Sequence, residues 1–280
     1  MTMRPLGLAA AFALLCLPLG AAAAERVVAV GGSVTETVFA LGAGDRLVAR
    51  DTTSTWPPDA EALPDVGYVR RLSPEGVLSV APDLILAEEG AGPPETVELL
   101  AAAEIPFVTI PDATDAEGVA RKVEAVGAAL GLEDRAAALA ASIRADMREI
   151  RERSEHIGTP ARVLFLLSAE GGRLMASGSG TAADSMIRLA GGENAATGFE
   201  GYKPLTDEAV LAAAPDVVLM MEGRAGHGGA GVLSHPALAA TPAGRDGRLV
   251  EMDGLYLLGF GPRTAEAVAD LHAALYPNES

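Results

Sequence analysis

Short apolar runs alternate along the chain with segments whose apolar residues recur at helical spacing. The apolar runs lie within residues 26–30, 84–87, 105–110, 162–167 and 217–221. Runs of this length that alternate with helical segments are typical of strands in a parallel sheet covered on both faces. The pattern therefore predicts an α/β fold with central, mostly parallel sheets.

Polar residues mark the points at which several helices are predicted to begin. Ser33 is followed three residues later by Glu36, which predicts a capping box, and Thr181 and Asp184 have the same spacing. Ser73 is followed by a proline at the first helical position, where the missing N–H has no intrahelical partner to lose. These signals predict helices beginning after each of the three hydroxyl residues.

The chain contains an internal repeat with an offset of 133 residues. Residues 73–86, SPEGVLSVAPDLIL, align without a gap with residues 206–219, TDEAVLAAAPDVVL. A less close pair relates residues 32–44 to residues 180–192. Two copies are too few for a solenoid, which needs about three stacked units, but they predict two similar lobes. Two lobes that face one cleft are a common way to enclose a small ligand.

A long helical segment separates the two copies of the repeat. Residues 133–156 contain neither glycine nor proline. We therefore expect an N-terminal lobe over residues 25–132, a rigid linking helix over residues 133–157 and a C-terminal lobe over residues 158–280. An ordinary amphipathic helix within one lobe is the alternative interpretation of the segment.

The first residues of the chain are predicted to be a signal peptide, residues 1–24, whose removal would leave a periplasmic protein. An apolar stretch over residues 6–19 is followed by four alanines at 21–24. That stretch is too short to span a membrane comfortably, and no other segment approaches the required length. Cys16, the one cysteine, would be removed, so we expect neither a disulfide nor a thiolate metal site. Lipoprotein cleavage before Cys16 is the alternative, which the bulky Leu15 disfavours.

Charge and motif content exclude several classes of function. The formal net charge of −17 argues against nucleic acids and anionic lipids as partners. The chain has no nucleophile elbow, no HExxH zinc motif and no Walker A sequence, so we expect no enzyme. Residues 226–231 match GxGxxG, but no strong βαβ unit with a well-placed acid follows, and we interpret them as a loop. The four histidines are not spaced as metal pairs, and His227 in the glycine loop is the best candidate to reach a ligand.

The segment most suggestive of function is residues 66–72, VGYVRRL, directly before the first repeat helix. We find nothing like it at the corresponding place in the second copy. Tyr68 is expected in a loop at the sheet edge, where open α/β sheets bind ligands. A phenolate suits ferric iron, tyrosine is a known haem ligand, and a nearby guanidinium favours the phenolate. Arg70 could donate to the phenolate and Arg71 could pair with a propionate; a packed tyrosine beside two surface arginines is the alternative.

The chain resembles the haem-binding periplasmic proteins of bacterial ABC importers for haem uptake. The resemblance covers nearly all of the chain after residue 24. The matching segments are 67–70 (GYVR), 72–78 (LSPEGVL), 181–184 (TAAD), 191–196 (GGENAA), 201–205 (GYKPL) and 257–263 (LLGFGPR). This combination is specific, whereas the PDL and PDV strand segments alone indicate only the wider class, which also contains siderophore and cobalamin binders.

The resemblance implies two α/β lobes joined by one long helix, of the class III periplasmic binding protein type. It also implies that ferric haem b, the transported ligand, lies between the lobes. Tyr68 would be its axial iron ligand, and Arg70 would be hydrogen-bonded to Tyr68. We expect a monomer that does not insert into the membrane and that delivers haem to an inner-membrane ABC permease. A ferric-siderophore or cobalamin carrier of the same fold is the alternative.

The second lobe is expected to contribute further contacts to the ligand. In the family that the chain resembles, some members hold two stacked haems, and a histidine of the second lobe is the other iron ligand. The loop that matches its position here, residues 168–173, has no histidine, so we do not expect two haems bound with that ligand. Met175, Tyr202 and His227 are the other candidate iron ligands in this lobe. Lys203 and Arg224 are its candidate propionate partners.

Docking to the permease is expected to use one glutamate on each lobe, as in the wider class that the chain resembles. The matching residues are Glu75 and Glu208, each in the first turn of its repeat helix. A symmetric pair of carboxylates suits a partner with two similar subunits. The alternative is that each carboxylate only stabilises its own helix dipole, by about 0.3–1 kcal/mol.

Overall fold

The computed structural model describes residues 24–223 and 230–277. The predicted signal peptide, with Cys16, therefore lies almost entirely outside the described residues. So do Arg224, His227 and most of the glycine segment 226–231. Within the described ranges, none of the helices combines the length and the apolar composition needed to cross a bilayer.

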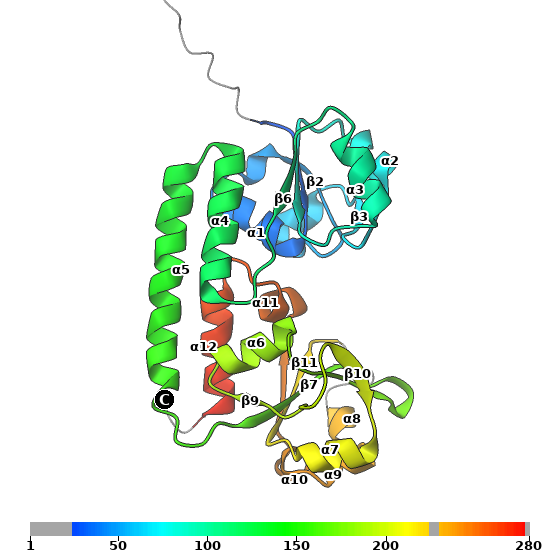
Figure 1. The fold of residues 1–280 in the computed structure, drawn as a ribbon, viewed down its shortest axis with the longest axis vertical. Coiled ribbons are helices and arrows are strands. Elements are labelled where there is room, and N and C mark those ends of the chain that lie inside the picture. The colour runs from blue at the N-terminus through cyan, green and yellow to red at the C-terminus, as the bar shows by residue number, and fades with distance from the viewer. Residues whose placement is uncertain (1–23, 224–229, 278–280) are drawn as a thin grey trace, which may run out of the picture.

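A four-stranded parallel sheet forms the centre of the N-terminal lobe (Figure 1). Its strands, in spatial order, are β2 (Leu47–Arg50), β1 (Val27–Val30), β5 (Leu84–Glu88) and β6 (Phe107–Ile110). All four residues of β1 are completely buried, which explains why this strand has no polar residue. The flanking elements are α1 (Gly32–Ala40), α2 (Pro74–Ser79), α3 (Pro94–Ala101) and a small hairpin of β3 (Gly67–Tyr68) and β4 (Arg71–Leu72).

The C-terminal lobe is built on a six-stranded sheet. Its strands are β10 (Tyr202–Leu205), β8 (Leu174–Ser177), β7 (Arg162–Ser168), β11 (Val217–Met221) and β12 (Leu249–Met252), with β9 (Glu193–Asn194) beside β7. β7, β9, β11 and β12 are parallel, whereas β8 and β10 are antiparallel to their neighbours. The helices are α6 (Ala182–Leu189), α7 (Asp207–Ala213), α8 (Ala230–Leu233), α9 (Pro236–Ala239), α10 (Pro242–Asp246), α11 (Gly254–Leu258) and α12 (Thr264–Leu275). The predicted α/β class with mostly parallel sheets is confirmed.

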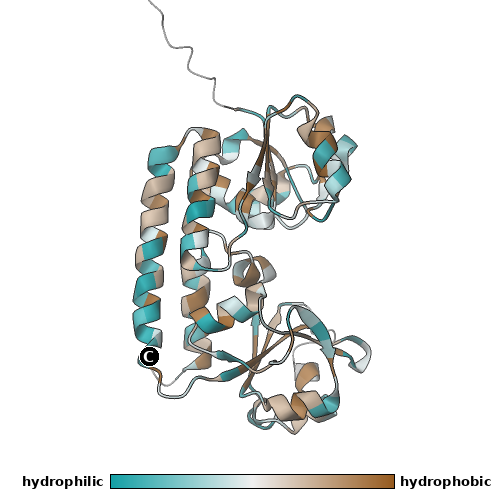
Figure 2. Ribbon diagram, in the orientation of Figure 1, coloured by the Kyte–Doolittle hydropathy of each residue, from teal (hydrophilic) through white to brown (hydrophobic). Residues whose placement is uncertain are grey.

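Three long helices form one side of the molecule, of which one runs along both lobes, one lies beside the N-terminal lobe and one beside the C-terminal lobe (Figure 1). In that order they are α5 (Glu133–Ser154), α4 (Ala116–Leu130) and α12. The outer surface of α5 is largely hydrophilic (Figure 2), whereas Ala136, Ile143 and Ile150 are buried on its inner face. One hydrophobic cluster includes residues of both sheets and of α5, so the cores of the two lobes are continuous behind the cleft.

The capping box predicted at Ser33 is wrong. α1 begins one residue earlier, at Gly32, and its N-cap is Gly31 at φ 109°, where no side chain caps the helix. Ser33 Oγ instead donates to Glu88 Oε1 at 2.6 Å. Glu36 is buried and ion-paired with Arg263. Both side chains are taken up by distant partners because a buried polar or charged group requires a hydrogen bond or an ion pair.

The other predicted caps are confirmed. Thr181 and Ser73 each precede a helix and accept a hydrogen bond from the backbone N–H three residues later. Thr206, which aligns with Ser73 in the repeat, does the same. These contacts are local, so the sequence spacing is sufficient to predict them.

Candidate ligand-binding site

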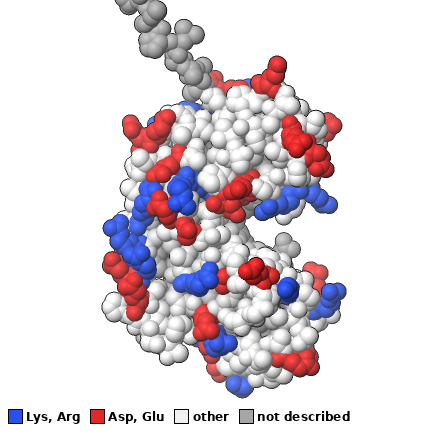
Figure 3. Space-filling model, in the orientation of Figure 1, with Lys and Arg blue, Asp and Glu red and all other residues white. Residues whose placement is uncertain are grey.

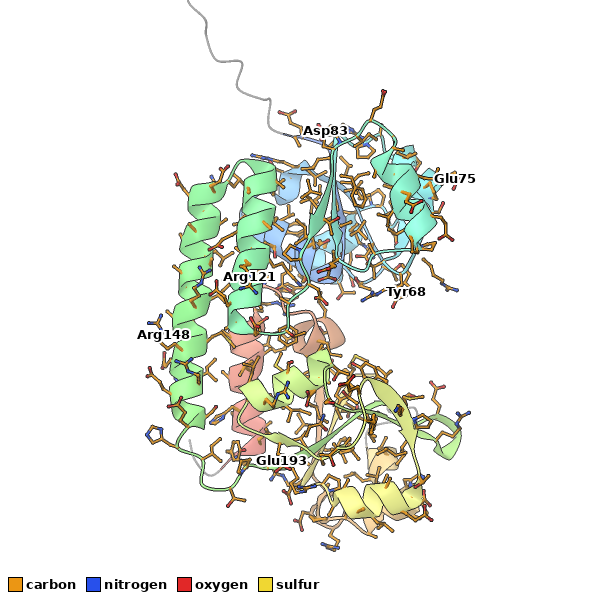
Figure 4. The ribbon with its side chains drawn as sticks, viewed as in Figure 1. Tyr68, Glu75, Asp83, Arg121, Arg148 and Glu193 are labelled. Carbon is orange, nitrogen blue, oxygen red and sulfur yellow. The ribbon has the colours of Figure 1, made fainter. Side chains whose placement is uncertain are left out.

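A cleft separates the two lobes on the side away from α4 and α5. Figure 3 shows the molecule hollowed there, with basic side chains along the lip formed by the N-terminal lobe. Tyr68 lies at the end of that lobe which faces the cleft (Figure 4). The residue singled out by the sequence pattern is therefore at the mouth of the cleft between the lobes.

The β3–β4 hairpin holds Tyr68 in position. The sequence predicts a loop here, but Tyr68 belongs to a two-residue strand in which it pairs directly with Arg71. Val66, Val69 and Leu72 are buried in the N-terminal lobe and anchor the hairpin. Gly67, at φ 107°, supplies a backbone conformation that other residues rarely adopt. The tyrosine is thus exposed on a firmly anchored support.

The phenol of Tyr68 is available to a ligand. Its side chain is 45% exposed, and its hydroxyl has no hydrogen-bond partner among the described residues. Directly opposed residues of an antiparallel pair have their side chains on the same face, about 4.5–5.5 Å apart at Cβ. Arg71, which is exposed, therefore shares the face of Tyr68 and can contribute positive charge beside the phenol oxygen.

Arg70 is placed differently from the expectation. Its Nη1 donates to the carbonyl oxygen of Gly90 at 2.9 Å, and no hydrogen bond joins it to Tyr68 within the described chain. Gly90 is at φ 80°, and a Cβ atom at this position would collide with Nη1 of Arg70. The expected Tyr68–Arg70 hydrogen bond is therefore absent from this structure, because the guanidinium packs on the loop after β5.

Tyr202, already a candidate for ligand contact, is a counterpart of Tyr68 in the second lobe. Tyr202 also follows a glycine with positive φ, Gly201, and also precedes the cap of a repeat helix. It is 40% exposed, nearly as much as Tyr68. The expectation that the second copy has nothing comparable is wrong. The Gly-Tyr signal is easily missed because its offset is one residue longer than that of the helices.

The two tyrosines differ in their chemical surroundings. Burial raises the pKa of Tyr202, and interactions with the hydroxyls of Thr181 and Ser177 offset only part of this effect. A raised pKa opposes formation of the phenolate. Tyr68, whose hydroxyl has no such partners in the described structure, is therefore the better candidate for a metal ligand.

Two further second-lobe candidates lie on opposite faces of the β8–β10 pair. Tyr202 pairs with Ser177, and Pro204 pairs with Met175, so the half-buried Met175 lies on the face of Tyr202. Lys203 lies on the other face, with its ammonium 5.5 Å from the ring centroid of Phe199. Met175 is thus the one of the two that shares a face with the second tyrosine.

Each histidine that the structure describes has a hydrogen-bond contact with the backbone. His235 caps α9, His156 Nδ1 lies 2.8 Å from the carbonyl oxygen of Glu152, and His272 Nδ1 lies 3.0 Å from that of Ala190. In residues 24–223 and 230–277, no group of three or more His, Cys, Asp or Glu side chains is arranged to hold a metal ion.

The two predicted docking glutamates have matching environments. Glu75 and Glu208 are exposed in the first turns of α2 and α7. Figure 4 shows Glu75 on the outer side of the N-terminal lobe. Backbone hydrogen bonding, followed by the hydroxyls of Ser73 and Thr206, holds the pKa of both carboxyls below its ordinary value. Both side chains therefore expose a negatively charged carboxylate to solvent at neutral pH.

Comparison with known proteins extends over almost the whole described chain. The family model described as "Periplasmic binding protein" matches residues 27–255. The periplasmic haem-binding protein BhuT, in complex with two haems, is 45% identical, with a TM-score of 0.86 over 90% of this chain and 98% of that one. The haem-binding protein RhuT from Roseiflexus sp. RS-1 is 42% identical, with the same TM-score and coverage. The vitamin B12-binding protein of Yersinia pestis (strain Pestoides F) is 30% identical over 78% of this chain and 79% of its own.

Proposed function

The chain belongs to the periplasmic binding protein family, and on that premise we propose that it carries ferric haem for iron uptake. The protein would capture haem between its lobes in the periplasm and deliver it to an inner-membrane ABC permease, acting as a carrier rather than an enzyme. The lobe limits 25–132, 133–157 and 158–280, and removal of residues 1–24, belong to the same proposal.

The observation that carries the proposal is the free phenol of Tyr68 at the mouth of the cleft. A phenolate is a hard anionic donor and is an established type of axial haem ligand. Arg71, directly opposite in the hairpin, presents a guanidinium on the same face as the phenol and would pair with a haem propionate. Haem b supplies a ferric centre and a large apolar surface, and removal of that surface from water drives binding.

Tyr202 and Met175 are proposed to line the opposite wall of the cleft. They share one face of the β8–β10 pair, and Tyr202 mirrors Tyr68 in its local setting. Their role would be packing against the macrocycle, since the surroundings of Tyr202 oppose a phenolate. Lys203 is less favoured as a propionate partner because its ammonium lies over Phe199.

A cobalamin carrier is the second candidate, favoured by the 30% identity to vitamin B12-binding proteins. The haem-binding structures are more similar, at 45% and 42% identity. A cobalt ion already held in a corrin ring, or an iron chelated by a siderophore, has no need of a protein phenolate. The free Tyr68 therefore favours haem.

The test is a titration of purified residues 25–280 with ferric haem, cobalamin and a ferric siderophore, followed by absorption spectroscopy. We expect saturable haem binding with a tyrosinate-type high-spin spectrum that Tyr68→Phe abolishes. Tyr202→Phe is the matched control, because it removes one hydroxyl from a similarly exposed tyrosine and should retain that spectrum. Wild-type haem affinity in Tyr68→Phe would overturn the ligand assignment, and saturable cobalamin binding without haem binding would select the alternative.

A further inference from the structure

A groove lies between the long helices, on the side of the molecule away from the ligand cleft. It is formed by the start of α4, the C-terminal half of α5, the end of α6 and the turn after α6, and its volume is about 980 Å³. Sites for small organic molecules have volumes of about 300–1,000 Å³. α4 packs against β6 of the N-terminal lobe and α6 against β7 of the C-terminal lobe. A molecule in this groove would therefore contact both lobes and the helix that joins them.

Four arginines line this groove. Arg144, Arg148 and Arg151 come from α5 and Arg188 comes from α6, and we call the site the arginine groove. Acidic residues outnumber Lys and Arg by 38 to 21 in the whole chain, so four arginines around one groove are unusual for this protein. A guanidinium is a planar fork of N–H donors that matches the oxygens of carboxylates and phosphates. The lining is therefore that of a site for an anion.

The three arginines of α5 form a row along one face of that helix. Arg144, Arg148 and Arg151 are separated by four and three residues, the spacings at which side chains are neighbours on a helix surface. Like charges at such spacings repel each other and destabilise a helix. The helix macrodipole favours a cation in the last turn, which accounts for Arg151 but not for Arg144 or Arg148. The row therefore calls for a negative partner.

Three acidic residues also line the groove, and two of them are engaged within the protein. Asp115 accepts a backbone N–H at 2.6 Å as the N-cap of α4. Glu117 accepts two hydrogen bonds from Arg144, at 2.7 and 2.8 Å, so the charge of Arg144 is neutralised. The third, Glu155, is 3.8 Å from Arg151, and both side chains are well exposed. Such a contact contributes little in water and can be exchanged for a better one.

Three guanidiniums of the groove keep N–H donors for a ligand. Arg148, on α5 away from the cleft (Figure 4), has neither an ion pair nor a hydrogen bond among the described residues. Arg151 has only its weak contact with Glu155. Arg188 has one partner in the described chain, Asp184, which lies 3.0 Å from Nη2 and leaves the other donors of that guanidinium unused. The unused donors come from two helices, one on each side of the groove.

We propose that the arginine groove binds an organic anion that carries two or more carboxylate or phosphate groups. Arg148, Arg151 and Arg188 would donate to its charged oxygens, and Met147 and Leu189, which also line the groove, would contact its carbon skeleton. The bound anion would cancel the repulsion along α5 and connect α5 with α6, so it would stabilise the folded protein. This site is separate from the ligand cleft and does not depend on the proposed function.

The test is isothermal titration calorimetry of purified residues 25–280, without haem, with citrate and with adenosine diphosphate. We expect saturable binding at a single site that weakens as sodium chloride is raised, and a higher midpoint of thermal unfolding when the anion is present. Acetate, which has one charge, should bind far more weakly than either probe. Binding of citrate alone would identify the carboxylate class, and binding of adenosine diphosphate alone the phosphate class. Saturable binding of neither probe would overturn the proposal.

Substitutions of exposed arginines test which groups hold the anion. Arg148→Gln and Arg188→Gln should each weaken binding by about tenfold, the effect of one charge-assisted hydrogen bond. Arg153→Gln is the matched control, because it also removes one exposed positive charge from α5, but Arg153 is paired with Glu149 and does not line the groove. It should leave the affinity unchanged. Equal weakening in Arg153→Gln would show a response to net charge alone and would overturn the site.

Arg71→Gln distinguishes the groove from the ligand cleft. Arg71 is exposed beside Tyr68 at the mouth of the cleft, where an anion could also be attracted. Citrate or adenosine diphosphate should bind this variant with wild-type affinity. Loss of binding in Arg71→Gln, together with wild-type affinity in Arg148→Gln, would place the anion in the cleft and overturn the proposal.

Discussion

Arg263 Nη2 of the C-terminal lobe donates to Glu36 Oε2 of the N-terminal lobe at 2.8 Å, and the backbone N–H of Arg263 donates to Oε1 at 3.1 Å. The guanidinium lies between two aromatic rings, 4.4 Å from the centroid of Trp56 and 4.9 Å from that of Tyr256. Glu36 is almost completely buried. The ion pair between Glu36 and Arg263, with two aromatic rings against the guanidinium, therefore joins the two lobes.

A second polar contact lies nearby. Lys122 Nζ, which is completely buried, donates to Glu88 Oε1 at 2.7 Å and to Ser33 Oγ at 2.9 Å, and it reaches the carbonyl oxygen of Gly259 at 3.4 Å. Gly259 follows α11, which lies between the two sheets (Figure 1). Together with the continuous core, these contacts oppose large rotation of one lobe against the other.

Loss of Arg263 should destabilise the protein strongly. Arg263→Gln leaves the carboxylate of Glu36 buried without its cation, which we expect to lower the free energy of unfolding by about 3–5 kcal/mol. Urea denaturation measures this change. Adding Glu36→Gln removes the stranded charge and should recover part of the loss. A double variant no more stable than Arg263→Gln would show that the ion pair is not the cause.

Gly90 should resist substitution for two reasons, which are its positive φ and the closeness of the Arg70 guanidinium. Gly90→Ala forces a non-glycine residue to φ 80° and displaces Arg70, so we expect about 1 kcal/mol of strain plus about 1 kcal/mol for the lost hydrogen bond. Gly198→Ala is the control, since Gly198 has φ 85° and no described atom lies within 4 Å of the point that a Cβ would occupy. It should show the strain alone in urea denaturation. In an Arg70→Ala background, Gly90→Ala and Gly198→Ala should lower the free energy of unfolding by the same amount. If Gly90→Ala still costs more than Gly198→Ala in that background, the contact with Arg70 is not the cause.

Arg71 should matter more to haem affinity than Arg70. Arg71 shares the face of Tyr68, whereas Arg70 is bonded to Gly90. We expect Arg71→Gln to weaken ferric haem binding by about tenfold, the effect of one charge-assisted hydrogen bond, and Arg70→Gln to weaken it less. Quenching of the Trp56 fluorescence on haem titration measures both affinities. A larger loss in Arg70→Gln would show that Arg70 leaves Gly90 when the ligand binds.

Tyr256 should resist ionisation at alkaline pH. Burial is the main cause that raises the pKa of Tyr256. The carboxylate of Asp270, which accepts a hydrogen bond from the Tyr256 hydroxyl at 2.8 Å, raises this pKa further. An unfolded tyrosine ionises at about pH 10. The folded state therefore binds more protons above that pH, so the free energy of unfolding should fall as pH rises beyond about 10.

Ultraviolet difference titration of tyrosinate checks this expectation. Tyr256→Phe should remove the highest-pH step of the titration and make the alkaline loss of stability shallower. An unchanged titration curve in that variant would mean that Tyr256 ionises with the ordinary tyrosines.

Local sequence patterns are sufficient to predict the elements whose causes are local. The continuous apolar run at β5 and the caps at Ser73 and Thr206 follow from contacts within a few residues, and spacing alone predicts them. The repeat likewise determined that the chain has two lobes. The proposal that the ligand is haem came from a resemblance, since a Gly-Tyr-Val-Arg segment alone is compatible with a surface tyrosine.

The hydrogen-bond and ion-pair partners of the polar side chains depend instead on how the chain packs in three dimensions. Ser33 and Glu36 have the spacing of a capping box, yet their partners are Glu88 and Arg263, the latter 227 residues away. Arg70 follows Tyr68 closely in sequence but bonds to Gly90. Packing of the lobes and loops brings these groups together, and a buried or confined polar group bonds to whatever that packing supplies. Residues far apart in the sequence form these contacts, so local patterns predict where helices and strands begin but not which polar side chains bond to each other.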